Sequence, residues 1–281
     1  MNVTVLIENT APEGSGLFEE HGLSLHLDCP QSGGILLDAG SSGRFADNAE
    51  KLGVDLGAVR LAVLSHGHYD HADGFRRFFR LNSSAPVLIR EGADGPLFSV
   101  TDEDVHYIGI HRELLEEHRD RFVPVRGTYA VAPGLWLTSC RSRDPAFTGR
   151  AANLAYKRGE NDFVPDDFRH EQSLVAETER GLAVFNSCSH AGAVNIVRDV
   201  LADFPGRRVS AFIGGLHMFS RTGSGMNCTP GYVCSVADAL RDLGVEELRI
   251  GHCTGAPALE LMRRRFGPGC TPLTGGEVFS V

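Results

Sequence analysis

A short apolar run that ends in four potential metal ligands constrains this chain more than any other stretch. Residues 61–64 are apolar and predict a buried strand, and His66, His68, Asp70 and His71 follow it. Because side chains alternate along extended backbone, His66 and His68 are expected on one side, and the turn after them lets Asp70 and His71 face back. Imidazole and carboxylate groups are ligands of zinc and similar divalent ions. The cluster therefore predicts a metal site at a strand end.

The composition indicates which partners and which cellular compartment to expect. The chain has 281 residues and a formal net charge of −9, with acidic and basic side chains interspersed. A nucleic-acid-binding surface would need a clustered basic face, and no apolar run approaches the length of a membrane span. Residues 1–7 are typical of a strand and not of a signal peptide. Seven scattered cysteines suit a reducing compartment. We expect a cytoplasmic protein with a small-molecule substrate and neither nucleic-acid nor membrane partners.

The order of the predicted elements places further histidines at strand ends. Alternating strands are predicted first, and repeated strand–helix units follow them. Three of the later strands lead into a histidine: His190, His217 and His252. Ligands at strand ends are a common way to build a site on a rigid sheet edge. No linker divides the pattern, so we predict a single domain over residues 1–281.

Two segments depart from this regular pattern. Residues 91–128 show little alternation apart from a charged helix predicted at 112–122, and we expect an insertion or lid over the mouth of the site. Residues 141–167 are polar and rich in Gly, Asn and Arg. A stretch of this length without a regular pattern is more often a functional loop than a core connection. We therefore predict a long loop there.

Several runs of the sequence resemble one known family. They lie at residues 4–10, 21–24, 64–71, 188–195, 214–217 and 252–255. The His-x-His-x-Asp-His run is the signature of the metallo-β-lactamase superfamily. The other runs resemble its cytosolic metal-dependent hydrolase branch, which is related to an archaeal dihydropterin-aminobenzene-phosphate synthase. The resemblance implies an αββα sandwich of the α/β (α+β) class, with two mixed sheets, outer helices, and one or two metal ions at one edge.

The ligand set that this resemblance implies contains one departure from the superfamily. Many members place a bridging Asp after a Gly where this chain has Asn186 and the four residues after it, so no carboxylate is available there. His190 is then expected to complete the first metal site, although His170 is an alternative. The implied first site is His66, His68 and His190, and the implied second site is Asp70, His71 and His252. Zinc is the expected ion, with manganese and iron as alternatives.

The expected chemistry is hydrolysis by a metal-bound hydroxide. Asp70 would orient the water, and His217 would donate a proton or contact the substrate. Helices are predicted to begin at Ala191 and Ala256, and Thr254 and Gly255 would let an anionic group approach the second helix. We therefore expect a small anionic ester, lactone or phosphodiester as the substrate.

Three other functions remain open at this stage. The first is a transferase like the dihydropterin-aminobenzene-phosphate synthase. The second is a non-heme iron oxidoreductase, although such members of the superfamily typically carry Glu at the position of His68. The third is a metal-binding protein without turnover. Cys188 and Cys253 flank predicted ligands and are predicted to be small buried residues, with a reactive thiol as the alternative.

Overall fold

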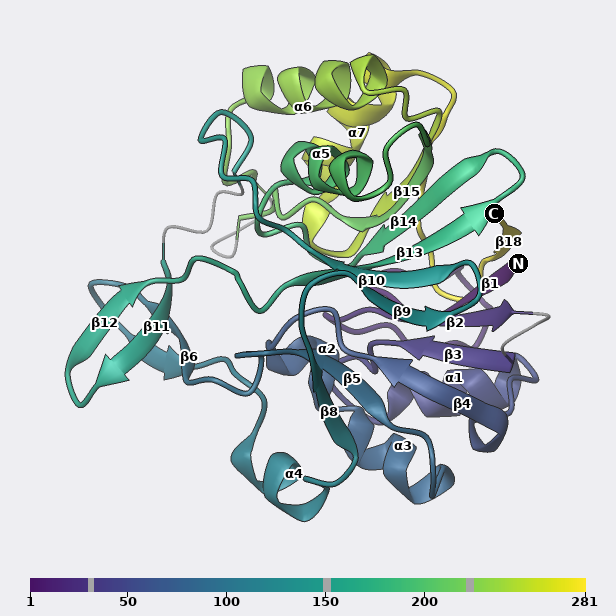
Figure 1. Cartoon of the computed structure of the whole chain (residues 1–281), viewed down its shortest axis with the longest axis vertical. Coiled ribbons are helices and arrows are strands. Elements are labelled where there is room, and N and C mark those ends of the chain that lie inside the picture. The colour runs from purple at the N-terminus through teal and green to yellow at the C-terminus, as the bar shows by residue number, and fades with distance from the viewer. Residues whose placement is uncertain (30–32, 149–152, 221–224) are drawn as a thin grey trace. The chain divides into compact units, whose positions relative to one another are not determined.

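The computed structural model describes residues 1–29, 33–148, 153–220 and 225–281, which form two units of the chain. Unit 1 comprises residues 1–126, 151–171 and 274–280, and unit 2 comprises residues 127–150 and 172–273 together with Val281. Figure 1 shows the elements of both units along the chain. No helix among the described residues combines the length and the apolar character needed to cross a bilayer.

The larger sheet of unit 1 has seven strands. They are β1 (Asn2–Ile7), β2 (Ser24–Cys29), β3 (Gly33–Leu37), β4 (Val59–Val63), β5 (Val87–Arg90), β8 (Phe122–Val125) and β18 (Val278–Ser280). Their order is β18-β1-β2-β3-β4-β5-β8. The pairs from β18 to β3 are antiparallel, and those from β3 to β8 are parallel. The motif strand β4 is therefore an inner, parallel strand.

The described residues of unit 1 form five short helices. They are α1 (Arg44–Lys51), η1 (Leu56–Ala58), α2 (Tyr69–Ala72), α3 (Phe75–Leu81) and α4 (Arg112–Glu117). In α3, Phe75, Phe78 and Phe79 recur at the spacing of one helix face and are buried in an apolar cluster with strand residues. Full burial of such a side chain contributes about 1.5–3 kcal/mol. This burial fixes the helix that follows the motif against the sheet.

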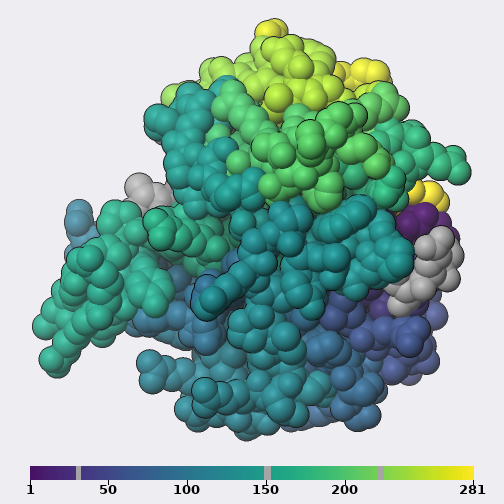
Figure 2. Space-filling view, in the orientation of Figure 1, coloured from purple at the N-terminus to yellow at the C-terminus, as the bar shows by residue number. Residues whose placement is uncertain are grey.

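A second, four-stranded sheet of unit 1 was not predicted from the sequence. It consists of β6 (Leu97–Val100), β7 (Val105–Tyr107), β11 (Leu154–Gly159) and β12 (Asp162–Pro165), in the order β12-β11-β6-β7. The β11–β12 hairpin stands out from the surface of the unit (Figure 2). Arg158 and Gly159 near its tip are exposed, so the segment lacks the alternation of a half-buried strand.

The two predicted irregular segments contain this sheet. Within residues 141–167, where a long loop was predicted, the structure has β11 and β12, while residues 149–152 lie outside the described part. Within residues 91–128 the structure has β6, β7, α4 and β8, and β8 is a strand of the seven-stranded sheet. The predicted segment therefore overlaps the seven-stranded sheet from Phe122 on, and the insertion and its role as a lid stay predictions.

Unit 2 contains another seven-stranded sheet. Its strands are β9 (Tyr129–Ala132), β10 (Leu135–Ser139), β13 (Gln172–Thr178), β14 (Gly181–Asn186), β15 (Val209–Gly215), β16 (Glu247–Gly251) and β17 (Cys270–Pro272). The order is β17-β16-β15-β14-β13-β10-β9, and β14 to β17 are parallel neighbours. The carboxyl ends of β14, β15 and β16 therefore meet at one edge of this sheet.

The helices of unit 2 connect these parallel strands. They are α5 (Ala193–Asp203), α6 (Pro230–Asp242), η2 (His252–Thr254) and α7 (Ala256–Phe266). Figure 1 shows α5, α6 and α7 together beside β14 and β15. Apolar residues of these helices form one buried cluster with the sheet, including Val197, Leu240 and Met262. The predicted fold class, α/β with two mixed sheets and packed helices, is confirmed. The start of α5 is at Ala193 and not at Ala191, because Gly192 with a φ of 93° turns the chain first.

Candidate metal centre

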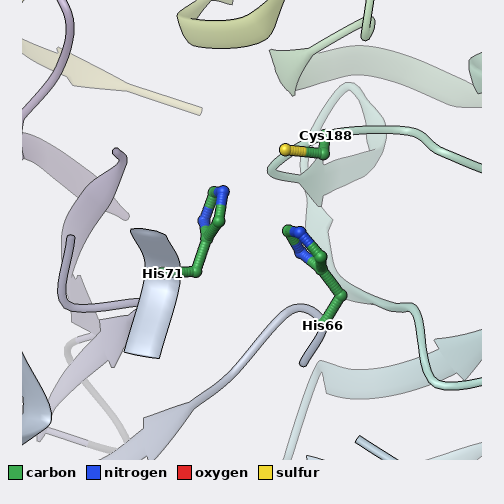
Figure 3. Close-up of side chains that lie close together, drawn as sticks. All are labelled: His66, His71 and Cys188. Atoms are coloured by element: carbon green, nitrogen blue, oxygen red, sulfur yellow. The ribbon is translucent and has the colours of Figure 1, made fainter. Parts of the chain in front are cut away.

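In unit 1, the end of β4 and the start of α2 carry the ligands predicted from the motif. His68 has extended backbone and is the N-cap residue of α2. The ring centroids of His66 and His68 lie 4.6 Å apart, and those of His66 and His71 lie 4.4 Å apart. Figure 3 shows the rings of His66 and His71. The structure thus brings the three buried imidazoles of the motif together within one unit.

Asp38, directly after β3, connects two of these imidazoles. Its Oδ2 accepts a hydrogen bond from Nδ1 of His71 at 2.7 Å and another from Oγ of Ser65 at 2.7 Å. Its Oδ1 accepts a bond from the backbone N–H of Ser65 at 2.7 Å. The hydroxyl of Ser65 in turn lies 2.8 Å from Nδ1 of His66. One fully buried carboxylate therefore orients both histidines.

This network determines which ring nitrogen of each histidine carries the proton. An ionised carboxylate only accepts hydrogen bonds, so Nδ1 of His71 must be the donor to Asp38. The Ser65 hydroxyl has one proton and donates it to Asp38. Nδ1 of His66 must therefore donate to the oxygen of that hydroxyl. In a neutral imidazole the other nitrogen then bears the lone pair. Nε2 is therefore the acceptor nitrogen of both His66 and His71, which is the form required for metal binding.

His170 belongs to the same unit and makes two hydrogen bonds. Its Nδ1 accepts the backbone N–H of Gly67 at 3.2 Å, and its Nε2 lies 2.9 Å from Oδ2 of the buried Asp166. Burial by itself raises the pKa of Asp166, but the hydrogen bond from His170 holds that pKa below its ordinary value. His170 therefore fixes the backbone between the two first histidines of the motif.

His68 is neutral in this environment. Burial, together with the neighbouring His170, lowers the pKa of His68 to about 3. A neutral imidazole is the protonation state that binds a metal. Donor atoms of His68, Asp166 and His170 also lie within 4.8 Å of one another, and a hydrogen bond already joins His170 to Asp166.

Asp70 lies between two imidazoles of unit 1. Its Oδ2 is 3.5 Å from Nε2 of His71 and 3.3 Å from Nε2 of His21, an exposed residue. Nδ1 of His21 lies 3.3 Å from Nδ2 of Asn9. The carboxylate predicted to bind metal and orient water therefore has a histidine on either side, one of which the sequence did not indicate.

In unit 2, the remaining predicted ligands follow the ends of parallel strands. Asn186 pairs with Gly214 and Gly215 pairs with Gly251 in the sheet register, and His190, His217 and His252 come a few residues after these positions. The ring centroids of His190 and His217 lie 4.2 Å apart. The structure thus places all three histidines beyond the same edge of this sheet.

The turns that carry these histidines have unusual backbone. His217 and His252 have φ angles of 47° and 48°, in the left-handed region that few non-glycine residues adopt. Such conformations cost about 1–3 kcal/mol and cluster at functional sites. In addition, Nδ1 of His217 is buried without a hydrogen-bond partner among the described residues.

The two residues predicted to contact the substrate lie just after His252. The hydroxyl of Thr254 is fully buried and accepts the backbone N–H of Leu216 at 3.1 Å, so it connects the ends of β15 and β16 and does not cap α7. Gly255 is the N-cap residue of α7, with a φ of 75°. A Cβ there would lie 2.9 Å from Cβ of Phe219. The role of both residues in substrate binding stays a prediction.

Three supporting residues of unit 1 could not be found from the motif alone: Asp38, Ser65 and Asp166. The only signals for them were an Asp that ends a strand, a Ser next to the first ligand, and an Asp four residues before a His. Each pattern is common, and the pairing of β3 with β4 is needed before Asp38 meets Ser65. The structure therefore adds the residues that orient the predicted ligands.

The two mixed sheets with their packed helices define an α/β protein. The histidines at the strand ends are of the kind that forms metal sites in such proteins. The sequence profile of the metallo-β-lactamase superfamily matches residues 27–201. That match covers more than half of the sequence, and the chain belongs to this superfamily.

Relatives of known sequence or structure cover almost the entire chain. It is 25% identical to the 7,8-dihydropterin-6-methyl-4-(β-D-ribofuranosyl)-aminobenzene-5′-phosphate synthase of Methanocaldococcus jannaschii, over 99% of this chain and 96% of the synthase. It is 28% identical to Tm1679, described as a metal-dependent hydrolase of the β-lactamase superfamily. Their structures match with a TM-score of 0.82 over 100% of this chain and 99% of the other.

A more distant structural neighbour shares the fold. Zn²⁺-bound PqqB from Methylobacterium extorquens is 13% identical to this chain, with a TM-score of 0.61 and complete coverage of both chains. At this identity the likeness concerns the fold alone.

Proposed function

We propose that the protein is a metal-dependent hydrolase that acts on a small anionic ester, lactone or phosphodiester. The observation that carries the proposal is the hydrogen-bond network in which Asp38 fixes the tautomers of His66 and His71. A histidine that binds a metal almost always donates its other ring N–H to a carboxylate or similar partner. Burying an ionised carboxylate costs free energy. The position of Asp38 between two neighbouring histidines is therefore best explained by a role in orienting them for a metal ion.

The proposed ligands are those predicted from the sequence. His66, His68 and His190 would hold a first ion, and Asp70, His71 and His252 would hold a second. The set consists of imidazole and carboxylate donors, which suits zinc and also manganese or iron. When bound, a divalent ion supplies a Lewis acid and lowers the pKa of a water molecule towards neutrality. His170 is not in the set, because Gly67 and Asp166 engage both of its nitrogens.

The protein's own residues would handle the substrate and the protons. The carboxylate of Asp70 would orient the attacking water by accepting one of its hydrogen bonds. Nδ1 of His217, buried without a partner among the described residues, would donate a proton or contact the substrate. The peptide groups at Thr254 and Gly255, at the start of the eleven-residue helix α7, would favour an anionic substituent.

One observation favours a second candidate function. The synthase of Methanocaldococcus jannaschii resembles this chain along 99% of its length, so a transferase that joins a dihydropterin to a ribofuranosyl-aminobenzene phosphate is the alternative. Both reactions would use an anionic substrate and the same metal ligands. The two proposals would share the fold and the ligand set, and the substrate would distinguish them.

A substrate panel tests both functions on the same preparation. Protein loaded separately with Zn²⁺, Mn²⁺ or Fe²⁺ is assayed against a generic phosphodiester, a lactone and a thioester, and against the two partners of the synthase reaction. The hydrolase proposal predicts turnover of at least one ester-type substrate, abolished in His68→Ala. Product formation from the dihydropterin pair alone would replace it with the synthase function. Absence of any metal uptake would contradict both.

We also propose that the protein works in the cytoplasm. One of the seven cysteines, Cys29, lies in unit 1 and the other six lie in unit 2, and none forms a disulfide in the described structure. Such usage suits a reducing compartment. Fractionation of the native host followed by detection of the protein would test this location.

A further inference from the structure

We propose that His21 of unit 1 is a positioning residue of the candidate site. Its Nε2–H holds the carboxylate of Asp70 in the orientation in which that carboxylate serves a metal ion and a water molecule. The inference rests on the proposed function, because it assigns a partner to the carboxylate that orients the attacking water. His21 acts through Asp70 and not on the substrate.

A chain of polar contacts determines which nitrogen of His21 carries the proton. The backbone N–H of Gly22 can only donate, so its bond of 3.5 Å to Asn9 identifies Oδ1 as the oxygen of that amide. The amide nitrogen Nδ2 of Asn9, a donor, therefore faces Nδ1 of His21 at 3.3 Å. In a neutral imidazole one nitrogen accepts and the other donates. Nδ1 of His21 accepts, and Nε2 carries the proton.

The proton on Nε2 of His21 faces a carboxylate oxygen. Oδ2 of Asp70 lies 3.3 Å from this nitrogen and 3.5 Å from Nε2 of His71. The His71 nitrogen is the acceptor of its ring, because Nδ1 of His71 donates to Asp38. Two electron-rich atoms that face each other repel, so the carboxylate of Asp70 tends to turn away from His71. The N–H of His21 opposes this tendency, because it interacts favourably with an ionised carboxylate.

Backbone hydrogen bonds attach both partners to one short segment after β3. The N–H of Gly40 donates to the carbonyl oxygen of Leu23 at 3.2 Å, and the N–H of Ala39 donates to that of His71 at 2.9 Å. Leu23 lies two residues after the proposed positioning histidine, and His71 directly follows its carboxylate partner. Two consecutive residues therefore fix the two chain segments relative to each other.

The backbones of the two segments also approach closely. A Cβ at Gly22 would lie 2.6 Å from the carbonyl oxygen of Asp70 and 3.0 Å from the backbone nitrogen of Ser41. Glycine directly after His21 therefore lets this part of the chain lie against the motif.

The loop that carries His21 is long but firmly held. Residues 8–23 form neither helix nor strand. The carboxylate of Glu20, the neighbouring residue, accepts the backbone N–H groups of Ser41 and Ser42 at 3.0 and 3.1 Å. An irregular loop of this length within a compact unit is usually functional. The held loop places the imidazole without help from burial, since 44% of the His21 side chain is exposed.

Metal affinity tests the role of His21 apart from turnover. Zn²⁺ binding to the full-length protein is measured by competition with a chelator, and Asp70→Ala identifies the ion that depends on this carboxylate. For that ion, His21→Ala should lose about 10- to 100-fold in affinity. His21→Gln carries an amide N–H the same number of bonds from Cβ as Nε2 and should restore most of the loss. His21→Asn is one bond shorter and should behave like His21→Ala.

His106→Ala is the matched control. Like His21, His106 is an exposed imidazole of unit 1 beside a carboxylate, with Nδ1 2.9 Å from Oδ2 of Asp104 and 40% of the side chain exposed. Its removal should leave the affinity for Zn²⁺ unchanged. Equal affinities in His21→Ala and in this control, or in His21→Gln and His21→Ala, would overturn the inference.

Turnover separates this inference from the proposed function. His21→Ala should lower kcat more than it raises KM, because Asp70 orients the water and does not bind the substrate. Ester turnover with unchanged kcat and metal affinity in His21→Ala would overturn the inference and leave the proposed function intact. The expected order of affinities without any ester turnover would do the reverse. Wild-type protein that binds no Zn²⁺ would overturn both. If His21→Ala does not fold, His21→Asn and His21→Gln still decide.

Discussion

The backbone N–H of Gly67 donates a hydrogen bond of 3.2 Å to Nδ1 of His170, a residue 103 positions later in the chain. Gly67 lies between the ligand candidates His66 and His68, so this bond fixes the chain at the centre of the motif. A Cβ at Gly67 would lie 2.1 Å from the carbonyl oxygen of Ala93, and no other residue fits there. His170 therefore acts on the site through the backbone.

This arrangement predicts different results for two histidine variants. His190→Ala should lose most of the bound metal on dialysis, because it removes a ligand. His170→Ala should retain metal with an affinity weakened by about 10- to 100-fold, as expected for an outer partner. Metal content after dialysis, measured by elemental analysis, distinguishes them. If the His170 variant loses its metal and the His190 variant keeps it, the ligand assignment is wrong.

Asp38→Asn should weaken metal binding without disturbing the backbone. Asn tolerates the φ of 57° observed at this position, but its NH2 group cannot accept, so at least one of the three bonds that Ser65 and His71 donate to the carboxylate loses its acceptor. We expect a loss of about 10- to 100-fold in metal affinity, measured by competition with a chelator. Asp28→Asn, an exposed position on β2, is the matched control. Equal affinity in the two variants would remove Asp38 from the site.

Purified protein should contain about one to two divalent ions per chain, as expected for sites of this ligand type. His66→Ala and His68→Ala should abolish turnover while circular dichroism stays close to that of the wild type, because apolar burial stabilises both sheets. A large loss of secondary structure in these variants would make the metal structural. Unchanged turnover would exclude the motif from the reaction.

Asp199 of α5 should stabilise the protein in a pH-dependent way. It accepts hydrogen bonds from the hydroxyl and the backbone N–H of Ser142, at 2.7 and 2.8 Å. Burial alone raises the pKa of Asp199, but the bonds from Ser142 and from the backbone of Arg141 hold it below its ordinary value. At neutral pH, Asp199→Asn should lower the free energy of unfolding by about 1–3 kcal/mol.

The sign of this pH dependence follows from the lowered pKa. The stabilisation is present above the unfolded-state pKa of about 3.9 and is lost as the pH falls through the folded-state pKa. The free energies of unfolding of wild type and Asp199→Asn, measured in urea, should therefore begin to converge below about pH 4 and meet below the folded-state pKa. Asp203→Asn, which removes the ion pair with the half-exposed Arg141 and alters a partly exposed hydrogen bond from the Thr128 hydroxyl, is the control and should cost about 0–1 kcal/mol. A constant difference at all pH values would contradict this assignment.

Strong local patterns made most of the fold predictable from the sequence. The alternation at residues 3–7 and the spacing of Phe75, Phe78 and Phe79 each depend on a buried face. The β11–β12 hairpin was missed because its polar, exposed strands carry no such pattern. The predicted ligands follow from residue type and strand ends, whereas Asp38 acquires its role only through the pairing of β3 with β4.

Thr254 illustrates a second limit of local reasoning. Its place before a helix indicated a substrate contact, yet its hydroxyl accepts the backbone N–H of Leu216, 38 positions away. Such contacts depend on the register of parallel strands, which sequence patterns alone do not determine. The same holds for the cysteines, since only the folded unit 2 brings Cys188 near Cys253.

The pairing of β1 with β18 has a consequence for biosynthesis. Val3 pairs with Phe279, so one outer strand of the unit 1 sheet leaves the ribosome long after the strand beside it. Unit 1 also contains residues 151–171, which follow the first segment of unit 2 in the sequence. Multidomain chains usually fold one unit after the other during translation. Unit 1 cannot complete its fold in this way, because its last strand is synthesised after unit 2. During synthesis β1 has an uncovered edge, and a nascent chain stalled before residue 278 should be prone to edge-to-edge aggregation.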